Sequence, residues 1–545
     1  MERTGILTQF PVFIWHFVPI FLYAETHYRF RYFISFLRKR EPEIIADAPH
    51  RVEPNSPLPI LILVKDAHLF PVSLDGILLT IRSKGSIVLE TKLLNSPIEI
   101  HQKEWYQVFE IPVIGLTGTI ECDVVFELND NHQKRFYHND NHRTSSHRPL
   151  KVFVSSNRLP RFEHLYLGEC HSHSNYTDDQ VEFGSPLGAS AQVCHSLGLS
   201  FFCVTDHSYD LDDNVDNYLK NDPNLPKWRQ LQQEVDDHNS RYSDFTIVRG
   251  EEVTCRNSDN QNVHLLLLGN HRFIAGSGDS AERWLKTRSE NTCDEVLEVK
   301  ELSTLAFAAH PCEPVSFIQR LLLRRGTWHT RDLTNTKLTG IQFANGQLSN
   351  GFQQGYQEWI KALLQGRQLS VVAGNDAHGN FNRFRQIGIP FIKIHEMDHQ
   401  IFGKMRTGVF LDSLSEIHIL DALRSGMSII TDGPVMNLQV ISSDHQMSSI
   451  GHKYDGRKHT ILLEAHSSTE YGSIDVLNVF QGIVGQKEIE LISEKDLKSF
   501  NIDRNISLEI ESDSYLRAEV RTSSLESYDG QPHFCITNPL WFIHG

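Results

Sequence analysis

The sequence lacks CxxC cysteine pairs, long runs of lysine and arginine, and a convincing N-terminal signal peptide. Its eight cysteines are scattered, which argues against a zinc ribbon or a dense disulfide framework and favours a reducing, cytoplasmic compartment. The 52 basic and 68 acidic side chains give a formal charge of −16. Because duplex nucleic acid requires a broad basic surface, we expect no nucleic-acid partner. A small anionic substrate is compatible with this charge where bound cations reverse the local sign.

Residues 1–48 form a hydrophobic and basic segment that we expect to be helical. Residues 6–24 are about as long as a membrane span, but two prolines, a glutamine and a histidine interrupt them. The basic, aromatic stretch HYRFRYFISFLRKR follows, and such a stretch can lie on an anionic membrane surface. Two alternatives stay open: helices packed on the protein's own core or on a second subunit of a homo-oligomer, and peripheral membrane contact through residues 1–40.

The 545 residues are too many for one hydrophobic core and predict about three or four units. In residues 49–157 short runs of Ile, Val and Leu recur between turn residues, which predicts a β-sandwich. In residues 158–412 apolar strands alternate with helical stretches, which is typical of βα units and predicts an α/β barrel of parallel strands. Apolar runs typical of strands return in residues 413–545 and predict a C-terminal β-rich domain.

Residues that can bind metal ions follow the apolar strands of the central part. In a βα barrel the carboxyl ends of the strands converge on one face, so we expect these side chains to meet. They are His171 and His173, Asp206 and His207, Glu251 and Glu252, His310, and Asp376 and His378.

The spacing of these residues has a geometric meaning. Residues i and i+2 of an extended segment project to the same side, so His171 can share a metal ion with His173. Glu251 and Glu252 are adjacent and must point in opposite directions, so only one of them is expected to be a ligand. A single pair of histidines is more often a polar pair without a metal, but five such events at corresponding strand ends are hard to obtain by accident. Imidazole and carboxylate together suit Zn, Mn or Fe, and a carboxylate can bridge two cations.

Six short motifs of the central part occur in the order typical of a known superfamily. HSHSNYTDD, VTDHS, GEEV, VHLLLLG, FAAHP and GNDAH resemble the motifs of the PHP (polymerase and histidinol phosphatase) superfamily. The resemblance covers residues 160–390 and implies a distorted seven-stranded βα (TIM-like) barrel that holds two or three divalent metal ions. More narrowly, AGNDAHGNFN, LDALRSGMSIITDGP and ITNPLWF are similar to segments of CehA/McbA-type metallohydrolases.

The resemblance also implies which residues hold the metal ions. One ion would be bound by His171, His173, Glu252 and Asp376, a second by Asp178, His207 and His378, and a third by Glu252, His264 and His310. Glu252 would bridge two ions, and Glu251 takes this role if the register of the motif differs by one residue. His264 rests on the resemblance alone, because it begins its strand rather than ending one.

Three further residues are candidates for supporting roles in catalysis. Asp206 could orient His207 or the loop that carries it, because a histidine ligand usually needs an outer partner. Arg383 and Arg385 could bind a substrate anion through two parallel hydrogen bonds. Surface ion pairs are the alternative for both arginines.

The resemblance implies a metal-dependent hydrolase that acts on a small molecule. The first hypothesis is a phosphoesterase in which a metal-bridging hydroxide attacks a small phosphate ester. The second keeps the same metal site but cleaves a carbamate, an ester or an amide, as the CehA/McbA likeness implies. The third is a non-catalytic scaffold that binds metal ions.

Overall fold

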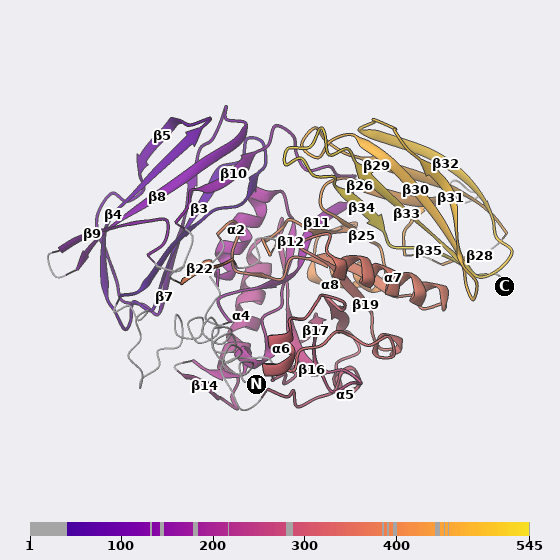
Figure 1. The fold of residues 1–545 in the computed structure, drawn as a ribbon, viewed down its shortest axis with the longest axis horizontal. Helices are drawn as coiled ribbons and strands as arrows, with labels where there is room; N and C mark the ends of the chain where they lie inside the picture. The colour runs from indigo at the N-terminus through magenta and orange to yellow at the C-terminus, as the bar shows by residue number, and fades with distance from the viewer. Residues whose placement is uncertain are drawn as a thin grey trace, which may run out of the picture.

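The computed structural model describes residues 41–130, 133–141, 147–177, 184–215, 217–278, 287–383, 386–389, 392–395, 400–441, 447–451, 453–455 and 457–543. Three parts lie in a row: N-terminal sheets, a central part with sheets and helices, and C-terminal sheets (Figure 1). Residues 1–40, for which the sequence leaves membrane contact open, lie outside the described residues. Within the described residues, no helix is both long and apolar enough to cross a bilayer.

The N-terminal part consists of two sheets around one apolar core. The smaller sheet contains β1 (Glu43–Asp47), β3 (Leu58–Lys65) and β7 (Glu104–Ile111). The larger contains β2 (Arg51–Val52), β10 (Leu150–Val154), β8 (Gly118–Asp130), β4 (Val72–Ser83) and β5 (Ser86–Lys92), with β6 (Ile98–Ile100) and β9 (Gln133–His138) beside β4 and β8. These sheets occupy the range in which the sequence predicts a β-sandwich.

Strand β1 corrects the prediction that residues 1–48 are helical throughout. Ile44 and Ile45 are adjacent, and both are buried, Ile44 in the main core and Ile45 against Leu63. Adjacent residues of a strand point to opposite faces, so β1 is covered on both sides. The β-branched pair favours this extended conformation.

The central part does not form the predicted barrel. Apart from two small hairpins, its strands divide between two sheets, and the described strands do not close into a ring. The first sheet contains β15 (Thr246–Val248), β12 (Phe201–Val204), β11 (Leu165–His173), β24 (Arg406–Phe410) and β25 (Ser428–Thr431), with β21 (Ala377–His378) beside β11. The second contains β16 (Gly250–Arg256), β17 (Asn262–Leu268), β18 (Leu305–Ala309), β19 (Gly340–Asn345) and β20 (Ser370–Gly374). The predicted distorted seven-stranded βα barrel is therefore wrong.

Two local features explain this difference. Strands β16 and β17 form an antiparallel hairpin in which Gly250 pairs with Leu268, and the short polar turn between them contains Asn260 at a positive φ of 58°. Strand β17 is also antiparallel to β18. At the other sheet, β25 pairs with β34 (Phe534–Thr537), so this sheet extends into the C-terminal part instead of closing on itself.

Helices cover the central sheets and fill the connections between strands (Figure 1). The longer ones are α2 (Leu187–Leu197), α4 (Pro226–Arg241), α7 (Asn350–Leu364) and α8 (Glu416–Ser425). The shorter ones are α3 (Ser208–Leu211), α5 (Cys293–Val299), α6 (Phe317–Leu322) and the 3-10 helix η2 (Asp332–Thr334). Two small hairpins pair β13 (Asp213–Asn214) with β14 (Asn217–Asn221) and β22 (Gln386–Ile389) with β23 (Ile392–His395).

The C-terminal part continues the first central sheet and adds a second sheet to it. The continuation contains β34, β33 (Ser514–Thr522), β30 (Ile474–Ile483) and β31 (Glu488–Glu494), with β35 (Leu540–Ile543) and β28 (Lys453–Asp455). The added sheet contains β27 (Met447–Ser449), β26 (Val435–Ile441), β29 (Lys458–His466) and β32 (Asn501–Glu509).

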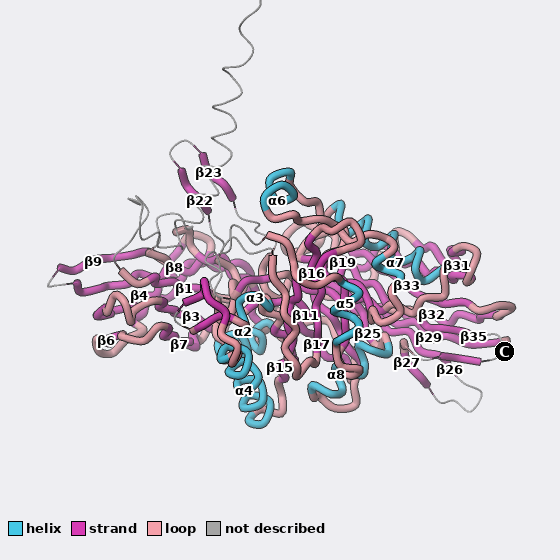
Figure 2. Tube along the Cα trace, turned by 90° about the horizontal axis from the view of Figure 1, so that it is seen from below, coloured by secondary structure: helices cyan, strands magenta, loops and turns pink. Residues whose placement is uncertain are grey.

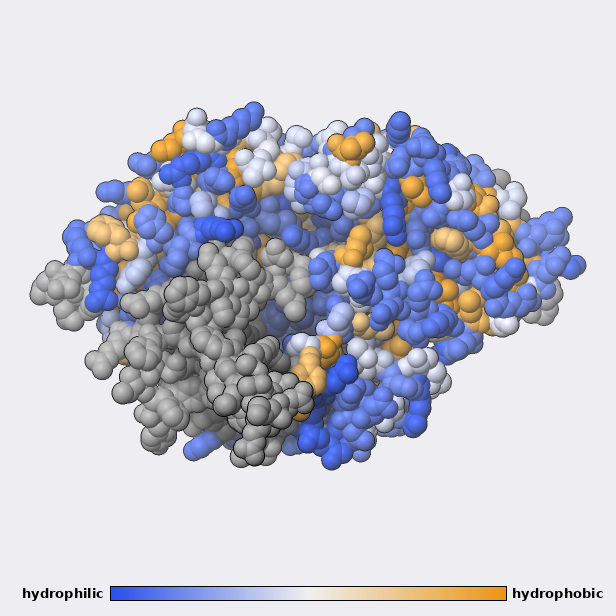
Figure 3. Space-filling view, in the orientation of Figure 1, coloured by the Kyte–Doolittle hydropathy of each residue, from blue (hydrophilic) through white to orange (hydrophobic). Residues whose placement is uncertain are grey.

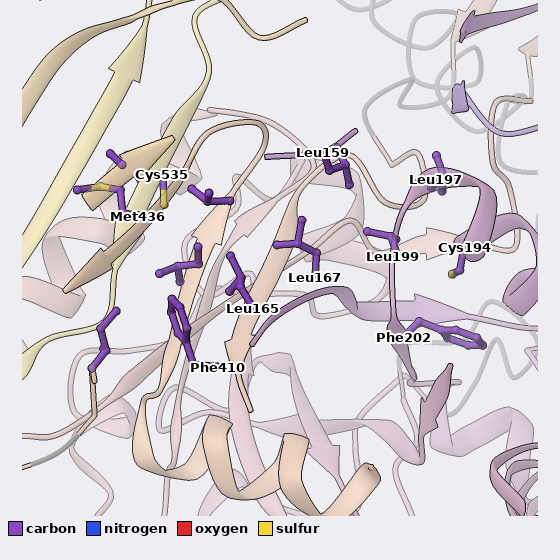
Figure 4. Close-up of a cluster of buried hydrophobic side chains, with 14 of the residues drawn as sticks. Leu159, Leu165, Leu167, Cys194, Leu197, Leu199, Phe202, Phe410, Met436 and Cys535 are labelled. Atoms are coloured by element: carbon purple, nitrogen blue, oxygen red, sulfur yellow. The ribbon is translucent and has the colours of Figure 1, made fainter. Parts of the chain in front are cut away.

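One apolar core runs across the expected boundary between residues 412 and 413. Leu165 and Leu167 of β11 belong to the same cluster of buried side chains as Met436 of β26 and Cys535 of β34 (Figure 4). The central and C-terminal parts therefore share a sheet and a core. Figure 3 shows one face of the molecule. Over the described residues of this face, hydrophobic residues are scattered and form no broad apolar patch.

Asp47, at the end of β1, fastens the N-terminal sheets to the central part. Its buried carboxylate accepts hydrogen bonds from the backbone N–H groups of Phe381 (2.8 Å) and Arg383 (3.0 Å), which lie in the loop after β21. Burial raises the pKa of Asp47 to about 6, although the guanidinium of Arg383 opposes this. The N-terminal part thus holds a loop of the central part in place.

We expect Asp47→Ala to lower the free energy of unfolding by about 3 kcal/mol, because the buried backbone N–H groups of Ala48, Phe381 and Arg383 lose their acceptor. Calorimetric melting of the full chain would measure this as a lower Tm. Glu90→Ala, at an exposed position of β5, is the control and should melt like the unsubstituted protein. Equal melting of the two variants would contradict the role given to Asp47.

Candidate metal centre

The structure gathers all the predicted metal ligands except Asp178, which lies outside the described residues, at one place where the two central sheets meet. They are His171, His173, His207, Glu252, His264, His310, Asp376 and His378. The two histidines of β11 end that strand, and His207, His310 and Asp376 follow β12, β18 and β20 within a few residues.

The carboxylate of Glu252 is fully buried and surrounded by imidazoles from both sheets. Its Oε1 lies 2.8 Å from His264 Nδ1 and 3.3 Å from His171 Nε2. Its Oε2 lies 3.0 Å from His207 Nδ1 and 3.5 Å from His173 Nε2. One carboxylate therefore contacts histidines that are distant in sequence, which is the arrangement that a bridging ligand requires.

Asp376 is the second carboxylate of the centre. Its Oδ1 lies 3.3 Å from His171 Nε2 and 3.2 Å from His173 Nε2, and its Oδ2 accepts a hydrogen bond of 2.7 Å from Gln400. Asp376 and His310 have positive φ angles of 52° and 28°. Such conformations are uncommon for residues other than glycine and cluster at functional sites.

The side chains form three groups in which the ligand atoms lie within 4.8 Å of one another. The groups are His171, His173, Glu252 and Asp376; Glu252, His264 and His310; and His173, His207 and His378. The first two are the ligand sets that the resemblance implies. The last contains His207 and His378 of the remaining set.

Several buried polar atoms of the cluster lack a hydrogen-bond partner within the described part of the chain, a role that a metal ion could fill. His171 Nε2, His207 Nδ1 and Glu252 Oε2 are buried and have no hydrogen-bond partner among the described residues. His207 Nδ1 and Glu252 Oε2 are close, but they are not aligned for a hydrogen bond. Buried polar atoms without partners are costly, and a divalent cation would satisfy a set of imidazole and carboxylate donors such as this one. The residues present therefore fit such an ion.

The position of His264 follows from the antiparallel hairpin. Strand β17 runs against β18, and Leu265 pairs with Ala308, so the beginning of β17 lies beside the end of β18. His264 and His310 therefore meet although one begins its strand and the other follows its strand. The rule that ligands follow the ends of strands therefore does not predict that His264 belongs to the cluster.

The structure places Glu252 in the cluster and Glu251 outside it. The carboxylate of Glu251 accepts hydrogen bonds from Ser208 Oγ (3.0 Å), Asn270 Nδ2 (2.7 Å) and the backbone N–H of Ile274 (3.0 Å). Adjacent strand residues point in opposite directions, as the sequence predicts for this pair. Burial raises the pKa of Glu251 to about 8.

Electrostatics differ among the members of the cluster. Burial favours the protonated form of Glu252, but the imidazoles of His264 and His171 outweigh burial and hold its pKa well below the usual range. Burial likewise favours the neutral form of His171, but Glu252 and Asp376 raise its pKa to about 9. Burial and the neighbouring His173 lower the pKa of His207 to about 4. Neutral His207 is the form that binds metal ions.

Two buried residues that the sequence did not single out support the ligands. Gln342 Oε1 accepts hydrogen bonds from His171 Nδ1 and the backbone N–H of His310, both 3.1 Å long, which leaves His171 Nε2 facing the cluster. Glu169 accepts hydrogen bonds from the backbone N–H groups of His171 (3.1 Å) and Asn375 (2.9 Å). It therefore ties the end of β11 to the loop that carries Asp376.

Gly374 allows β20 to approach β11 closely at His171. A Cβ atom at position 374 would lie 2.5 Å from the Cβ of His171. Because no side chain fits there, only glycine permits this approach. The glycine of the GNDAH motif thus has a packing role next to the aspartate and histidine that join the cluster.

The three supporting candidates have different outcomes. Asp206 accepts hydrogen bonds from the backbone N–H groups of Ser174 (2.7 Å) and Thr177 (2.9 Å), so it holds the loop after β11. The prediction that Arg383 binds a substrate anion is wrong: its side chain is buried and donates to the backbone oxygens of Ala46 (3.2 Å) and Arg148 (3.3 Å) in the N-terminal part. Arg385 lies outside the described residues.

Comparison with known proteins does not assign the chain to a family. No family model and no curated protein matches it. A putative beta-galactosidase from Bacteroides fragilis shares 9% identity, with 94% of this chain and 74% of that one covered and a TM-score of 0.19. A calcium-binding mutant of Bacteroides uniformis beta-glucuronidase 2 shares 12% identity, with 92% of this chain and 60% of that one covered and a TM-score of 0.18. Parabacteroides merdae beta-glucuronidase shares 8% identity, with 92% of this chain and 65% of that one covered and a TM-score of 0.17. The chain thus spans less than two thirds of both glucuronidases, and likenesses this weak carry no argument.

We expect Glu252→Gln to lose at least one equivalent of bound divalent metal, because an amide is a poorer ligand and cannot bridge two cations. Elemental mass spectrometry of the purified protein would measure this. Glu251→Gln is the matched control: an amide oxygen can still accept the hydrogen bonds at that position, so the metal content should stay unchanged. Equal metal content in both variants would contradict the central role of Glu252.

Proposed function

We propose that the protein is a metal-dependent hydrolase that acts on a small phosphate ester. The observation that supports this most directly is the sharing of one buried carboxylate, Glu252, between two groups of potential ligands. A purely structural metal site needs one closed set of ligands, whereas neighbouring ligand groups with a common carboxylate are suited to several ions acting on one substrate. The order of the motifs in the sequence supports the same proposal.

Divalent ions held by these side chains would supply an activated water and would stabilise negative charge on the substrate. The protein's own contribution is to fix the donors in advance. Gln342 orients His171, Gln400 donates to Asp376, and Glu169 holds the backbone beside both. Such preorganisation avoids the cost of rearranging ligands during the reaction.

A covalent intermediate on the protein is not part of this proposal. Cys170 adjoins His171 in sequence, but its side chain is fully buried and packs in an apolar cluster with Phe201 and Val248. A buried cysteine of this kind behaves as a small apolar side chain. The nucleophile we propose is therefore water.

We expect the protein, supplied with manganese or zinc, to hydrolyse aryl phosphates or cyclic phosphodiesters, and Asp376→Asn to lower this turnover at least about a hundredfold together with the metal content. A spectrophotometric panel that also contains aryl carbamates would measure this. Asp412→Asn, at an exposed aspartate, is the control.

The outcomes of this panel separate the alternatives. Turnover of carbamates alone would replace the phosphoesterase by a carbamate hydrolase with the same ligands. Full metal content without turnover of any ester would favour a non-catalytic scaffold. Unchanged metal content and turnover in Asp376→Asn would reject the assignment of the centre.

A further inference from the structure

A short loop leaves the body of the protein beside the candidate metal centre and returns to it. This loop, the α6 loop, comprises residues 312–327 and contains α6. It starts two residues after His310, and a hydrogen bond of 2.9 Å from the backbone N–H of Trp328 to the oxygen of Pro311 closes it. The indole of Trp328 also donates to the backbone oxygen of His264 (3.1 Å). Both ends of the α6 loop therefore lie next to residues of the ligand cluster.

The helix of this loop carries exposed apolar side chains. Phe317 and Leu321 are four residues apart, so their side chains lie on the same face of α6. This face is turned to solvent, because 73% of Phe317 and 55% of Leu321 are exposed. The hydroxyl of Ser316 caps the helix by accepting a hydrogen bond from the backbone N–H of Gln319 (3.2 Å). A capped helix thus presents two large apolar side chains at the periphery of the molecule, on the same side as the β22–β23 hairpin (Figure 2).

Positive charge accompanies the apolar face of α6. Arg320 and Arg324 are exposed, and neither forms an ion pair with a carboxylate of the described residues. The sequence contains no acidic residue between Glu313 and Asp332. The protein as a whole has a formal charge of −16. The α6 loop is therefore a basic region on a protein that is otherwise acidic, and it favours a partner with negative charge.

Exposed apolar and cationic side chains on one short helix fit an anionic lipid surface. The apolar side chains enter the boundary between headgroups and acyl chains, while the guanidinium groups stay with the charged headgroups. A protein partner fits less well. Stable protein interfaces bury about 800 Å² on each side, and one face of a six-residue helix offers much less. A membrane surface needs only a few inserted side chains.

We propose that the α6 loop docks the protein reversibly on anionic membranes. Phe317 and Leu321 enter the bilayer interface, and Arg320 and Arg324 bind the headgroups. This interaction goes beyond the hydrolase function proposed above and does not depend on it. Because both ends of the loop lie beside residues of the ligand cluster, docking brings the candidate metal centre to the lipid surface.

The test measures flotation of the full-length protein with phosphatidylcholine vesicles that contain or lack phosphatidylserine. We expect binding only to vesicles with phosphatidylserine, and weaker binding at high salt. An arginine near an anionic surface changes the affinity roughly fivefold, so Arg320→Gln/Arg324→Gln should bind at least about tenfold more weakly. Phe317→Ser/Leu321→Ser should lose a similar factor. The metal content and Tm of both variants should stay unchanged, because all four side chains are exposed.

Matched controls remove the same kinds of side chain elsewhere. Leu302→Ser/Leu525→Ser replaces two exposed leucines, and Arg229→Gln/Arg241→Gln replaces two exposed arginines of α4. Both controls should bind vesicles like the unsubstituted protein. A second measurement locates the contact: brominated lipids should quench additional tryptophan fluorescence in Phe317→Trp, but not in Leu302→Trp.

Failure of the unsubstituted protein to bind vesicles with phosphatidylserine would overturn the inference. Equal binding by the α6 variants would overturn it as well, because attachment would then belong to another part of the chain. A parallel loss of metal ions and vesicle binding would show that the α6 loop only supports the ligand cluster. If Phe317→Ser/Leu321→Ser instead dissociates a dimer in sedimentation experiments, the face of α6 contacts a second copy of the chain and not a membrane.

Discussion

The burial of one carboxylate among imidazoles is the interaction on which the centre depends. Moving the charge of Glu252 out of water is expensive, and the fold retains it only because His264, His171 and His207 surround it. These histidines come from strands or connections of two different sheets. The two sheets must therefore be held in a fixed position relative to each other, and much of the remaining structure can be understood as support for that positioning.

This support reaches far beyond the ligands. Glu169 holds β11 against the loop of Asp376. Gly374 has no side chain that would separate β20 from β11. Asp47 extends the support to the N-terminal sheets, because it fixes the loop that follows His378. The N-terminal sheets are thus joined to the loop beside the candidate centre through buried polar contacts, and not only through apolar packing.

The sequence predicted much of the centre and less of the fold. His171 and Asp376 could be anticipated because both lie at strand ends, and the ends of neighbouring strands meet whether or not the sheet closes. The barrel prediction was wrong because β16 and β17 look in the sequence like strands of two separate βα units, whereas the short turn between them makes an antiparallel hairpin. Arg383 lies next to a motif in sequence, but its side chain turns toward the N-terminal part. Proximity along the chain was misleading for this residue.

The pairing of β25 with β34 has a practical meaning for dissecting the molecule. Ile430 pairs with Ile536, so the edge of a sheet near the centre is completed by residues close to the end of the chain. A fragment that stopped near residue 440 would keep the gathered side chains but would expose the unpaired backbone of β25 together with an apolar surface. Such an edge invites pairing with other molecules. Domain-by-domain expression, guided by a boundary drawn through the middle of the chain, would therefore yield aggregates rather than a smaller working protein.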